Sequence, residues 1–245
     1  MSSLSALLTA LDERRALKVI SGLHNFDPQS VQKIVQAAAQ GGATWVDIAA
    51  DPALVAMVKG LVDLPVCVSA VDPEALAAAG ADLVEIGNYD SFYVQGRQFS
   101  AAEVLELTLA TRRLLPRTLL SVTVPHTLPL DQQVSLAEAL VKAGADWIQT
   151  EGGTSSTPQH SGTLGLIEKA APTLAATYEI SRAVNVPVIC ASGLSAVTVP
   201  MAIAAGASAV GVGSAVNRLQ DPVAMLAQVR SLVLALQTSR LAVRA

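Results

Sequence analysis

The chain has 245 residues, of which 51% are hydrophobic and 15% are charged, which is typical of one α/β domain with a sizeable core. The formal net charge of −4 and the sequence pI of about 5.3 argue against nucleic acid or an anionic membrane surface as a partner. No apolar run approaches the roughly 18 residues that a membrane-spanning helix needs.

A pattern of helix end, Gly-Ala and apolar strand recurs four times, as GGATWVDIA, AGADLVEIG, AGADWIQTE and AGASAVGVG. Glycine ends the preceding helix, and a continuous apolar run is typical of a strand that is buried on both faces. Repetition of this kind is what a series of βα units produces. We therefore predict a single (β/α)8 TIM barrel of the phosphate-binding type with an N-terminal extra helix.

The chain is expected to form one domain over residues 1–245, with the extra helix in 1–16, the barrel in 17–236 and a tail in 237–245. Leucines at helical spacing in the first segment indicate an amphipathic helix. Asp12 and Glu13 and the lack of a basic start argue against a targeting segment. We expect this helix to close or flank the base of the barrel.

Strands and helices alternate along the rest of the chain. The predicted strands are Leu17–Gly22, Trp45–Ala49, Pro65–Ser69, Leu83–Gly87, Thr118–Val124, Trp147–Thr150, Val186–Ala191 and Ala207–Val212. The predicted helices are Asp27–Gln40, Pro52–Leu61, Pro73–Ala79, Ala101–Leu115, Leu130–Ala143, Thr173–Val184, Ser195–Ala205, Ala215–Asn217 and Pro222–Leu236. Two long loops remain, Asn88–Phe99 and Glu151–Pro172, at strand ends where TIM barrels carry their chemistry. An open doubly wound sheet is the rival architecture, but eight units favour closure.

Small residues follow the last two predicted strands. Ser192 and Gly193 follow the first of them, and Gly213 and Ser214 follow the second. Glycine lets backbone N–H groups approach a ligand closely. Loops seven and eight of TIM barrels, with a short extra helix, are a common phosphate site. We predict that these four residues bind phosphate.

Three strands each carry a charged residue between apolar neighbours: Lys18, Asp47 and Glu85. A charge facing the helix layer would be buried without a partner, so we expect all three to point into the barrel. A lysine among carboxylates suits Schiff-base or acid–base chemistry, which makes the three candidate catalytic residues. The alternative is a structural ion-pair network. Gln149 lies at the same level and is a candidate substrate-binding residue.

Residues at the strand exits complete the predicted site. His126 and Glu151 follow strands five and six, and both are candidate catalytic residues for acid–base chemistry. Asn88, Gly152 and Gly153 begin loops on the same side and are candidate substrate-binding residues.

Other residues have secondary roles in this prediction. Tyr89 is expected to line the pocket beside Asn88, and His24 and His160 are further histidines on loops. No histidine pair has metal-ligand spacing, so no metal site is expected. Cys67 and Cys190 lie within apolar strands and are expected to be buried thiols in a reducing compartment.

Several blocks identify a family resemblance. They are ALKVISGLHNFDP, VEIGNYDSFY, LSVTVPH, QTEGG and ICASGLSAVTVPMAIAAGASAVGVGSAVN. They resemble the hypothetical chloroplast open reading frame twenty-three family of cyanobacteria and algal plastids, from Leu17 to Asn217. The resemblance implies a cyanobacterial cytoplasm or a plastid stroma as the location, and it implies no particular activity.

The last third of the chain is also similar to the endings of thiazole synthase and the barrel subunit of pyridoxal-phosphate synthase. By position, Gly193, Gly213 and Ser214 match the phosphate loops of those enzymes. Strands three, four and six lack the lysine with which such enzymes form imines, which leaves only Lys18. Flavin-binding barrels use similar terminal loops for the phosphate of FMN, so FMN is an alternative ligand.

Three functions are compatible with these features. The leading one is an enzyme that acts on a small phosphorylated metabolite by lyase, isomerase or aldol-type acid–base chemistry. The second is an FMN-binding oxidoreductase, and the third is a regulatory protein that binds such a metabolite without turnover. The expected partner is a phosphorylated small molecule, and the apolar helix faces permit a homo-oligomer.

Overall fold

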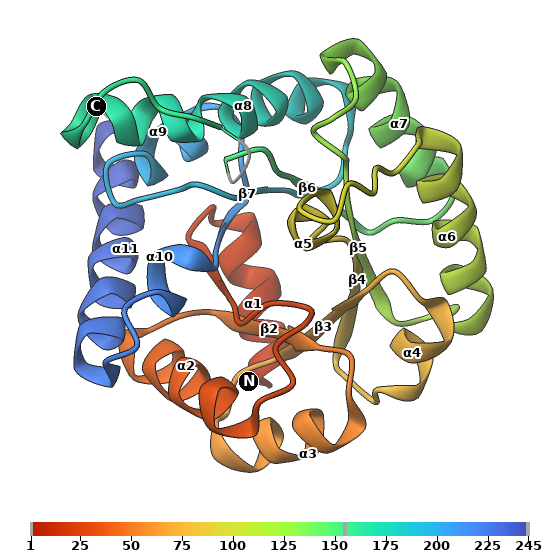
Figure 1. Cartoon of the computed structure of the whole chain (residues 1–245), viewed down its shortest axis with the longest axis horizontal. Coiled ribbons are helices and arrows are strands. Elements are labelled where there is room, and N and C mark those ends of the chain that lie inside the picture. Colours follow the sequence, from red (N-terminus) through yellow and green to blue (C-terminus); the bar gives the residue numbers. More distant parts are fainter. Residues whose placement is uncertain (1, 154–155, 244–245) are drawn as a thin grey trace.

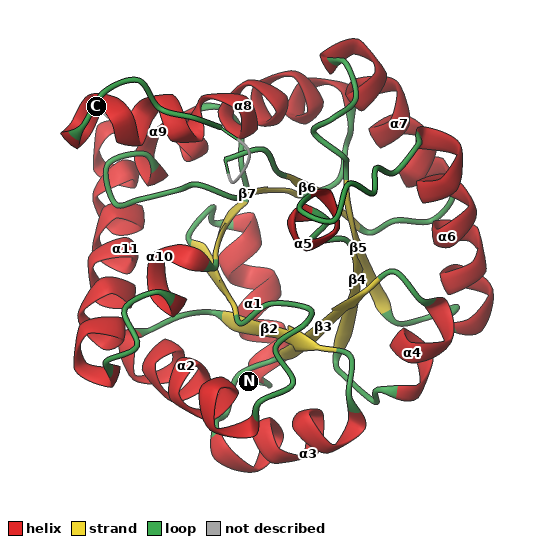
Figure 2. Cartoon of the chain, viewed as in Figure 1, coloured by secondary structure: helices red, strands yellow, loops and turns green. Residues whose placement is uncertain are grey.

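The strands close into a parallel barrel. The computed structural model describes residues 2–153 and 156–243. Eight strands pair in chain order and β8 pairs with β1, with helices around the ring (Figures 1 and 2). The strands are β1 (Ala16–Ile20), β2 (Trp45–Ala49), β3 (Val66–Ala70), β4 (Leu83–Ile86), β5 (Leu119–Thr123), β6 (Trp147–Thr150), β7 (Val188–Ala191) and β8 (Ala209–Val212). The predicted TIM barrel is confirmed.

Helices form the outer layer. They are α2 (Pro28–Gly41), α3 (Pro52–Leu61), α4 (Pro73–Ala78), α6 (Ala101–Leu114), α7 (Leu130–Lys142), α8 (Gly162–Ala183), α9 (Val199–Ala204) and α11 (Pro222–Val243), with the short α5 (Asp90–Tyr93) and α10 (Ser214–Asn217) at the mouth. Asp27, Asp51 and Asp72 cap α2, α3 and α4, because each carboxylate accepts a backbone N–H of the first turn. Among the helices of the described residues, none combines the length and apolarity needed to cross a membrane.

The N-terminal helix α1 (Ser3–Asp12) closes the base of the barrel. Leu7 and Leu11 are buried and pack with residues at the strand starts, including Trp45 and Trp147. These two indoles meet edge to face with centroids 6.3 Å apart. Figure 1 shows α1 within the ring of strands. Because the base is filled in this way, the mouth at the opposite end is the side left for a ligand.

The helix after β6 differs from the prediction. It begins at Gly162, well before the predicted Thr173, so that Pro172 lies inside α8. Proline removes one helical hydrogen bond, but the first turns gain other support. The Glu168 carboxylate accepts the backbone N–H groups of Gln159 and His160 at 2.8 and 3.1 Å. These contacts tie the preceding loop to the helix, and the sequence pattern did not indicate them.

Other boundaries also differ. The last helix, predicted as Pro222–Leu236, extends to Val243 in α11. The helix α9 begins at Val199 and not at Ser195, because the Thr198 hydroxyl accepts the Ser195 N–H at 2.9 Å and forms a separate turn. The expected loop after β4 contains the helical turn α5. This turn brings Asp90 and Tyr93 to the barrel mouth.

Candidate functional site

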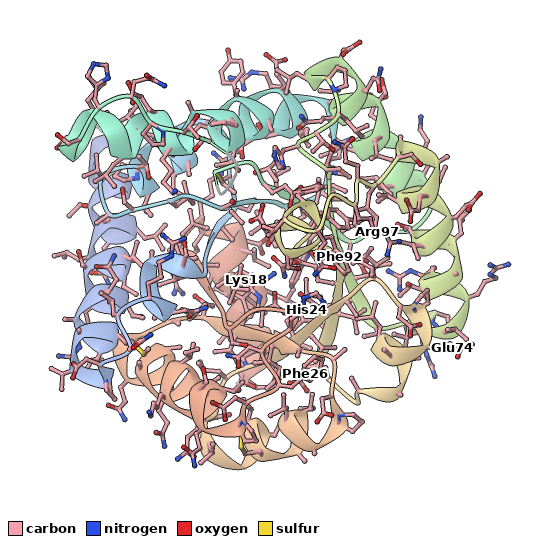
Figure 3. All side chains as sticks on the ribbon, in the orientation of Figure 1. Lys18, His24, Phe26, Glu74, Phe92 and Arg97 are labelled. Carbon is pink, nitrogen blue, oxygen red and sulfur yellow. The ribbon has the colours of Figure 1, made fainter. Side chains whose placement is uncertain are left out.

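A network of charged side chains fills the barrel interior. Lys18 Nζ lies 3.0 Å from Asp47 Oδ2 and 2.7 Å from Glu85 Oε2, and it donates to Gln149 Oε1 at 3.0 Å. All four residues are at most 1% exposed. They come from β1, β2, β4 and β6, and two of their network partners are strand neighbours of Glu85, since Glu85 pairs in register with Ser69 and Ser121. Figure 3 shows Lys18 inside the ring of strands and Glu74 on the outer rim. The predicted inward orientation is confirmed.

Every carboxylate oxygen of this network accepts a hydrogen bond or an ion pair. The Ser69 hydroxyl lies 2.7 Å from both oxygens of Asp47. Glu85 Oε2 accepts from the Ser121 hydroxyl at 2.7 Å, and Glu85 Oε1 accepts from Gln149 Nε2 at 2.8 Å. Full pairing of this kind is what makes buried charges tolerable.

The charge state of Lys18 disfavours imine formation. Burial lowers the pKa of its ammonium group, but the carboxylates of Asp47 and Glu85 outweigh burial and raise that pKa above its usual range. Burial also raises the pKa of Glu85, against the opposing effect of Lys18. An imine forms from the neutral amine, so the network holds Lys18 in the unreactive form.

A cavity of about 520 Å³ opens at the carboxyl ends of the strands. The predicted residues that line it are Asn88, Gln149, Glu151, Ser192, Gly193, Gly213 and Ser214. The loop after β1 also contributes, with Ser21, His24 and Asn25. Asn88 Nδ2 lies 3.1 Å from Asp47 Oδ2 and 3.3 Å from Glu85 Oε1, so Asn88 and Gln149 connect the cavity to the buried network. Four predicted site residues do not belong to the described lining of the cavity: Lys18, Asp47, Glu85 and His126.

Backbone packing shapes the turn after β7. Ser192 and Gly193 both have left-handed conformations, with φ of 75° and 74°. A Cβ on Gly193 would lie 2.6 Å from Gly153 Cα, so the β6 loop and this turn touch backbone to backbone. A Cβ on Gly152 would lie 2.9 Å from Pro172 Cβ. Gly152 and Gly153 therefore allow close packing behind the cavity, and neither belongs to its described lining.

The two oxygens of Glu151 have different environments. Oε1 accepts from the Tyr93 hydroxyl at 2.5 Å and from the His126 backbone N–H at 3.2 Å, and it lies 3.1 Å from His126 Nδ1. Oε2 is buried and has no hydrogen-bond partner in the part of the chain that the structure describes. The residue is 4% exposed and lines the cavity. One oxygen is therefore anchored, while the other is buried and has unused hydrogen-bonding capacity.

Glu151 and His126 influence each other's ionisation. Burial raises the pKa of Glu151, and the hydrogen bonds from His126 and Tyr93 offset only part of that effect. Burial lowers the pKa of His126, but the hydrogen bond and charge of Glu151 outweigh it and raise that pKa. Both shifts favour a proton held between the two side chains.

Comparison with known proteins assigns the chain to a family. The family model described as "Protein of unknown function (DUF561)" matches residues 1–242. The chain belongs to this family. Two relatives are each described as "Uncharacterized protein ycf23". The one from Pyropia yezoensis is 40% identical over 243 residues, covering 98% of this chain and 89% of the relative. The one from Cyanophora paradoxa is 46% identical over 220 residues, covering 88% and 90%. The family resemblance seen in the sequence blocks is confirmed.

Solved structures share the fold at low identity. (S)-3-O-geranylgeranylglyceryl phosphate synthase from Thermoplasma acidophilum, in complex with sn-glycerol-1-phosphate, has a TM-score of 0.66 at 14% identity and covers 97% of this chain and 99% of its own. Thiamine phosphate pyrophosphorylase from Pyrococcus furiosus has a TM-score of 0.61 at 18% identity and covers 94% and 98%. Identities this low establish the TIM-barrel fold alone.

The structure adds two residues at the mouth that the sequence did not predict as site residues, Asp90 and Tyr93. The loop motif NYDSFY indicated polar and aromatic residues there, but not which of them turn inward. Asp90 lines the cavity and accepts from the Ser192 hydroxyl at 3.4 Å, and its buried Oδ1 has no partner among the residues described. Asp90, His126 and Glu151 each offer a ligand atom, and these atoms lie within 4.8 Å of one another. Spacing along the chain could not reveal this set, because its members come from three loops.

The remaining candidates have separate environments. Tyr89 is fully buried with its ring 4.4 Å from that of Phe99, so the expectation that it lines the cavity is wrong. His24 lines the cavity and packs edge to face on Phe92 with ring centroids 5.2 Å apart. Figure 3 labels both residues in the central part of the view. His160 is exposed and pairs with Glu168 at 2.6 Å, away from the described lining. The two cysteines are buried free thiols, as predicted.

Proposed function

We propose that the chain is an enzyme that binds a small phosphorylated metabolite in the cavity and acts on it by proton-transfer chemistry of the lyase, isomerase or aldol type. The observation that carries the proposal is that the turns Ser192–Gly193 and Gly213–Ser214 line the same cavity as Glu151. In this proposal the turns supply backbone N–H groups for a phosphate, and Glu151, which lines the cavity, supplies a carboxyl oxygen that no described residue binds. Two proteins with this fold carry a phosphate compound in their names, which supports the ligand class.

Glu151 is the catalytic residue in this proposal. Its Oε1 is anchored by Tyr93 and His126, so its Oε2 keeps a defined position at the cavity wall. A carboxylate held in this way can take the proton from the carbon beside a substrate carbonyl and return it to that carbon or to the oxygen on which negative charge develops. His126 then acts through Glu151, as a positioning residue that shares its proton.

Lys18, Asp47 and Glu85 act as positioning residues in the same scheme. Lys18 and Glu85 bind the two ends of the Gln149 amide and fix its orientation. Asn88 Nδ2 faces Asp47 and Glu85. The side-chain oxygen of Asn88 is then left to accept a hydrogen bond from a hydroxyl group of the metabolite. The cavity floor therefore suits a hydroxylated carbon skeleton.

As part of the same proposal, the protein acts in a cyanobacterial cytoplasm or a plastid stroma.

Hydrogen exchange tests the proposed chemistry without knowledge of the natural substrate. Phosphorylated aldehydes and ketones of three to six carbons are incubated with the protein in deuterated water, and deuterium incorporation beside the carbonyl is followed by proton NMR. We expect catalysed exchange with at least one compound, and a loss of about 100-fold in Glu151→Gln. His160→Gln, at an exposed pair outside the cavity lining, is the matched control and should retain the wild-type rate.

The proposal fails if no compound undergoes catalysed exchange, or if Glu151→Gln exchanges as fast as the wild type. Phosphate binding without any exchange would favour the regulatory alternative, a protein that holds the metabolite without turnover.

A further inference from the structure

We propose that Asp90, His126 and Glu151 form a binding site for a divalent transition-metal cation at the cavity wall. Their ligand atoms lie within 4.8 Å of one another. A cation with bonds of about 2.1 Å holds tetrahedral donors about 3.4 Å apart, so small side-chain rotations would bring the three atoms onto one ion. The set combines one imidazole nitrogen with carboxylate oxygens.

Unpartnered carboxylate oxygens point to a missing ligand. Glu151 is 4% exposed, and among the described residues its Oε2 has no hydrogen-bond partner. Asp90 Oδ1 is also buried, and no described residue bonds to it. Buried polar atoms in folded proteins are almost always satisfied by protein, water or an ion. Two such oxygens on residues of the same cluster are accounted for together by one cation.

The local charge also favours a cation. Among the side chains described in residues 2–153 and 156–238, the only basic one paired with either carboxylate is His126, through Glu151. The ammonium group of Lys18 is paired with two other carboxylates, those of Asp47 and Glu85. Two carboxylates facing one imidazole therefore leave negative charge that a doubly charged ion would neutralise.

The site has the supporting contacts that metal ligands need. Tyr93 donates to Glu151 Oε1 and packs edge to face on His126 with centroids 4.9 Å apart. Contacts of this kind hold ligands in position before the ion arrives. Imidazole with carboxylates favours Mn²⁺ or Zn²⁺, since sites made of oxygen alone are typical of Mg²⁺ and Ca²⁺.

The place of the site links it to the proposed chemistry. Asp90 Oδ2 accepts from the hydroxyl of Ser192, which belongs to the proposed phosphate turn. A cation here would stabilise negative charge on a substrate oxygen in place of the Glu151 proton. Only this consequence rests on the proposed function, because cation binding itself requires no substrate.

Calorimetric titration of the full chain tests the site directly. The protein is first treated with a chelator and then titrated with MnCl2 or ZnCl2 in the absence of any organic ligand. We expect one site per chain that Asp90→Asn and Glu151→Gln each weaken by at least about tenfold. Glu168→Gln, which removes the carboxylate of the exposed His160 pair, is the matched control and should leave the affinity unchanged. Circular dichroism verifies that each variant is folded, and Asp90→Asn tests the site alone if Glu151→Gln is unfolded.

The inference is overturned if neither cation binds, if Asp90→Asn binds as tightly as the wild type, or if Glu168→Gln removes the binding. Its failure is distinguishable from that of the proposed function. Cation binding without catalysed exchange would contradict only the proposed enzyme function. Catalysed exchange by a protein that binds no cation would contradict only the metal site.

Discussion

The ammonium group of Lys18 lies between two carboxylates that the barrel has removed from water. Burial of three charges has an unfavourable desolvation free energy. Their mutual attraction offsets it only while all three charges are present. The network is therefore vulnerable to the loss of any single member, although it makes a fully bonded floor for the cavity.

We expect Lys18→Met to lower the free energy of unfolding by about 3–5 kcal/mol, because it leaves Asp47 and Glu85 buried without their cation. Urea unfolding followed by circular dichroism measures the change. Lys59→Met is the control, since Lys59 pairs with Asp82 at the surface, where a salt bridge contributes less than about 1 kcal/mol. Equal losses in the two variants would contradict the account of the network.

The inward direction of these charges could be predicted from sequence, because strand residues alternate faces and Lys18, Asp47 and Glu85 are flanked by apolar residues. The anchoring of Glu151 could not. It depends on Tyr93, which comes from a different loop and reaches Glu151 only because α5 forms a helical turn. Contacts between loops leave no periodic signal in one sequence.

At the scale of elements, the cavity depends on close contact between the β6 loop and the turn after β7. Gly153 and Gly193 meet through their backbones, and a Cβ at either position would overlap the other residue. The lack of side chains at both positions brings the Ser192–Gly193 turn toward the wall that carries Glu151.

We expect Gly153→Ala to weaken the binding of inorganic phosphate by at least about tenfold, because the added methyl group pushes the turn away from its position and displaces its N–H groups. Titration followed by ³¹P NMR measures the affinity. Gly60→Ala is the matched control: Gly60 lies in α3 with open space around it, so alanine should leave binding intact and stabilise the helix by about 0.5–1 kcal/mol. Unaltered binding in Gly153→Ala would show that this contact does not shape the site.

The base of the barrel gives a separate prediction. Leu7 of α1 is fully buried against the strand starts, whereas its neighbour Leu8 is 41% exposed. We expect Leu7→Ala to cost about 2–5 kcal/mol of unfolding free energy in urea, since it leaves a cavity under the strands. Leu8→Ala should cost less than about 1 kcal/mol. Similar costs for both would mean that α1 does not seal the base.

Element boundaries show where sequence patterns reach their limit. Asp-Pro pairs correctly marked the starts of α2, α3 and α4, because capping is a local interaction. The predicted loop that ends at Pro172 is wrong for the opposite reason. Contacts between Glu168 and the residues before the helix accompany an α8 that begins at Gly162.

For the whole molecule, the repeated Gly-Ala-strand pattern was sufficient to predict the closed barrel, because each repeat specifies one βα unit. Closure then brings the ends of all strands to one mouth. The cavity, with glycine turns on one part of its lining and Glu151 on another, is a consequence of that topology. Which loops touch above it depends on side-chain packing that the repeats do not encode.

The central claim is that the glycine turns of this cavity bind phosphate. Titration with inorganic phosphate, followed by ³¹P NMR, compares the wild type with Ser214→Asp and Ser100→Asp. Both serines are exposed at a helix start, where aspartate is well tolerated, but only Ser214 lines the cavity. We predict that the wild type binds, that Ser214→Asp loses at least about tenfold in affinity by charge repulsion, and that Ser100→Asp is unchanged. Equal affinity in all three proteins, or no binding by the wild type, would contradict the claim.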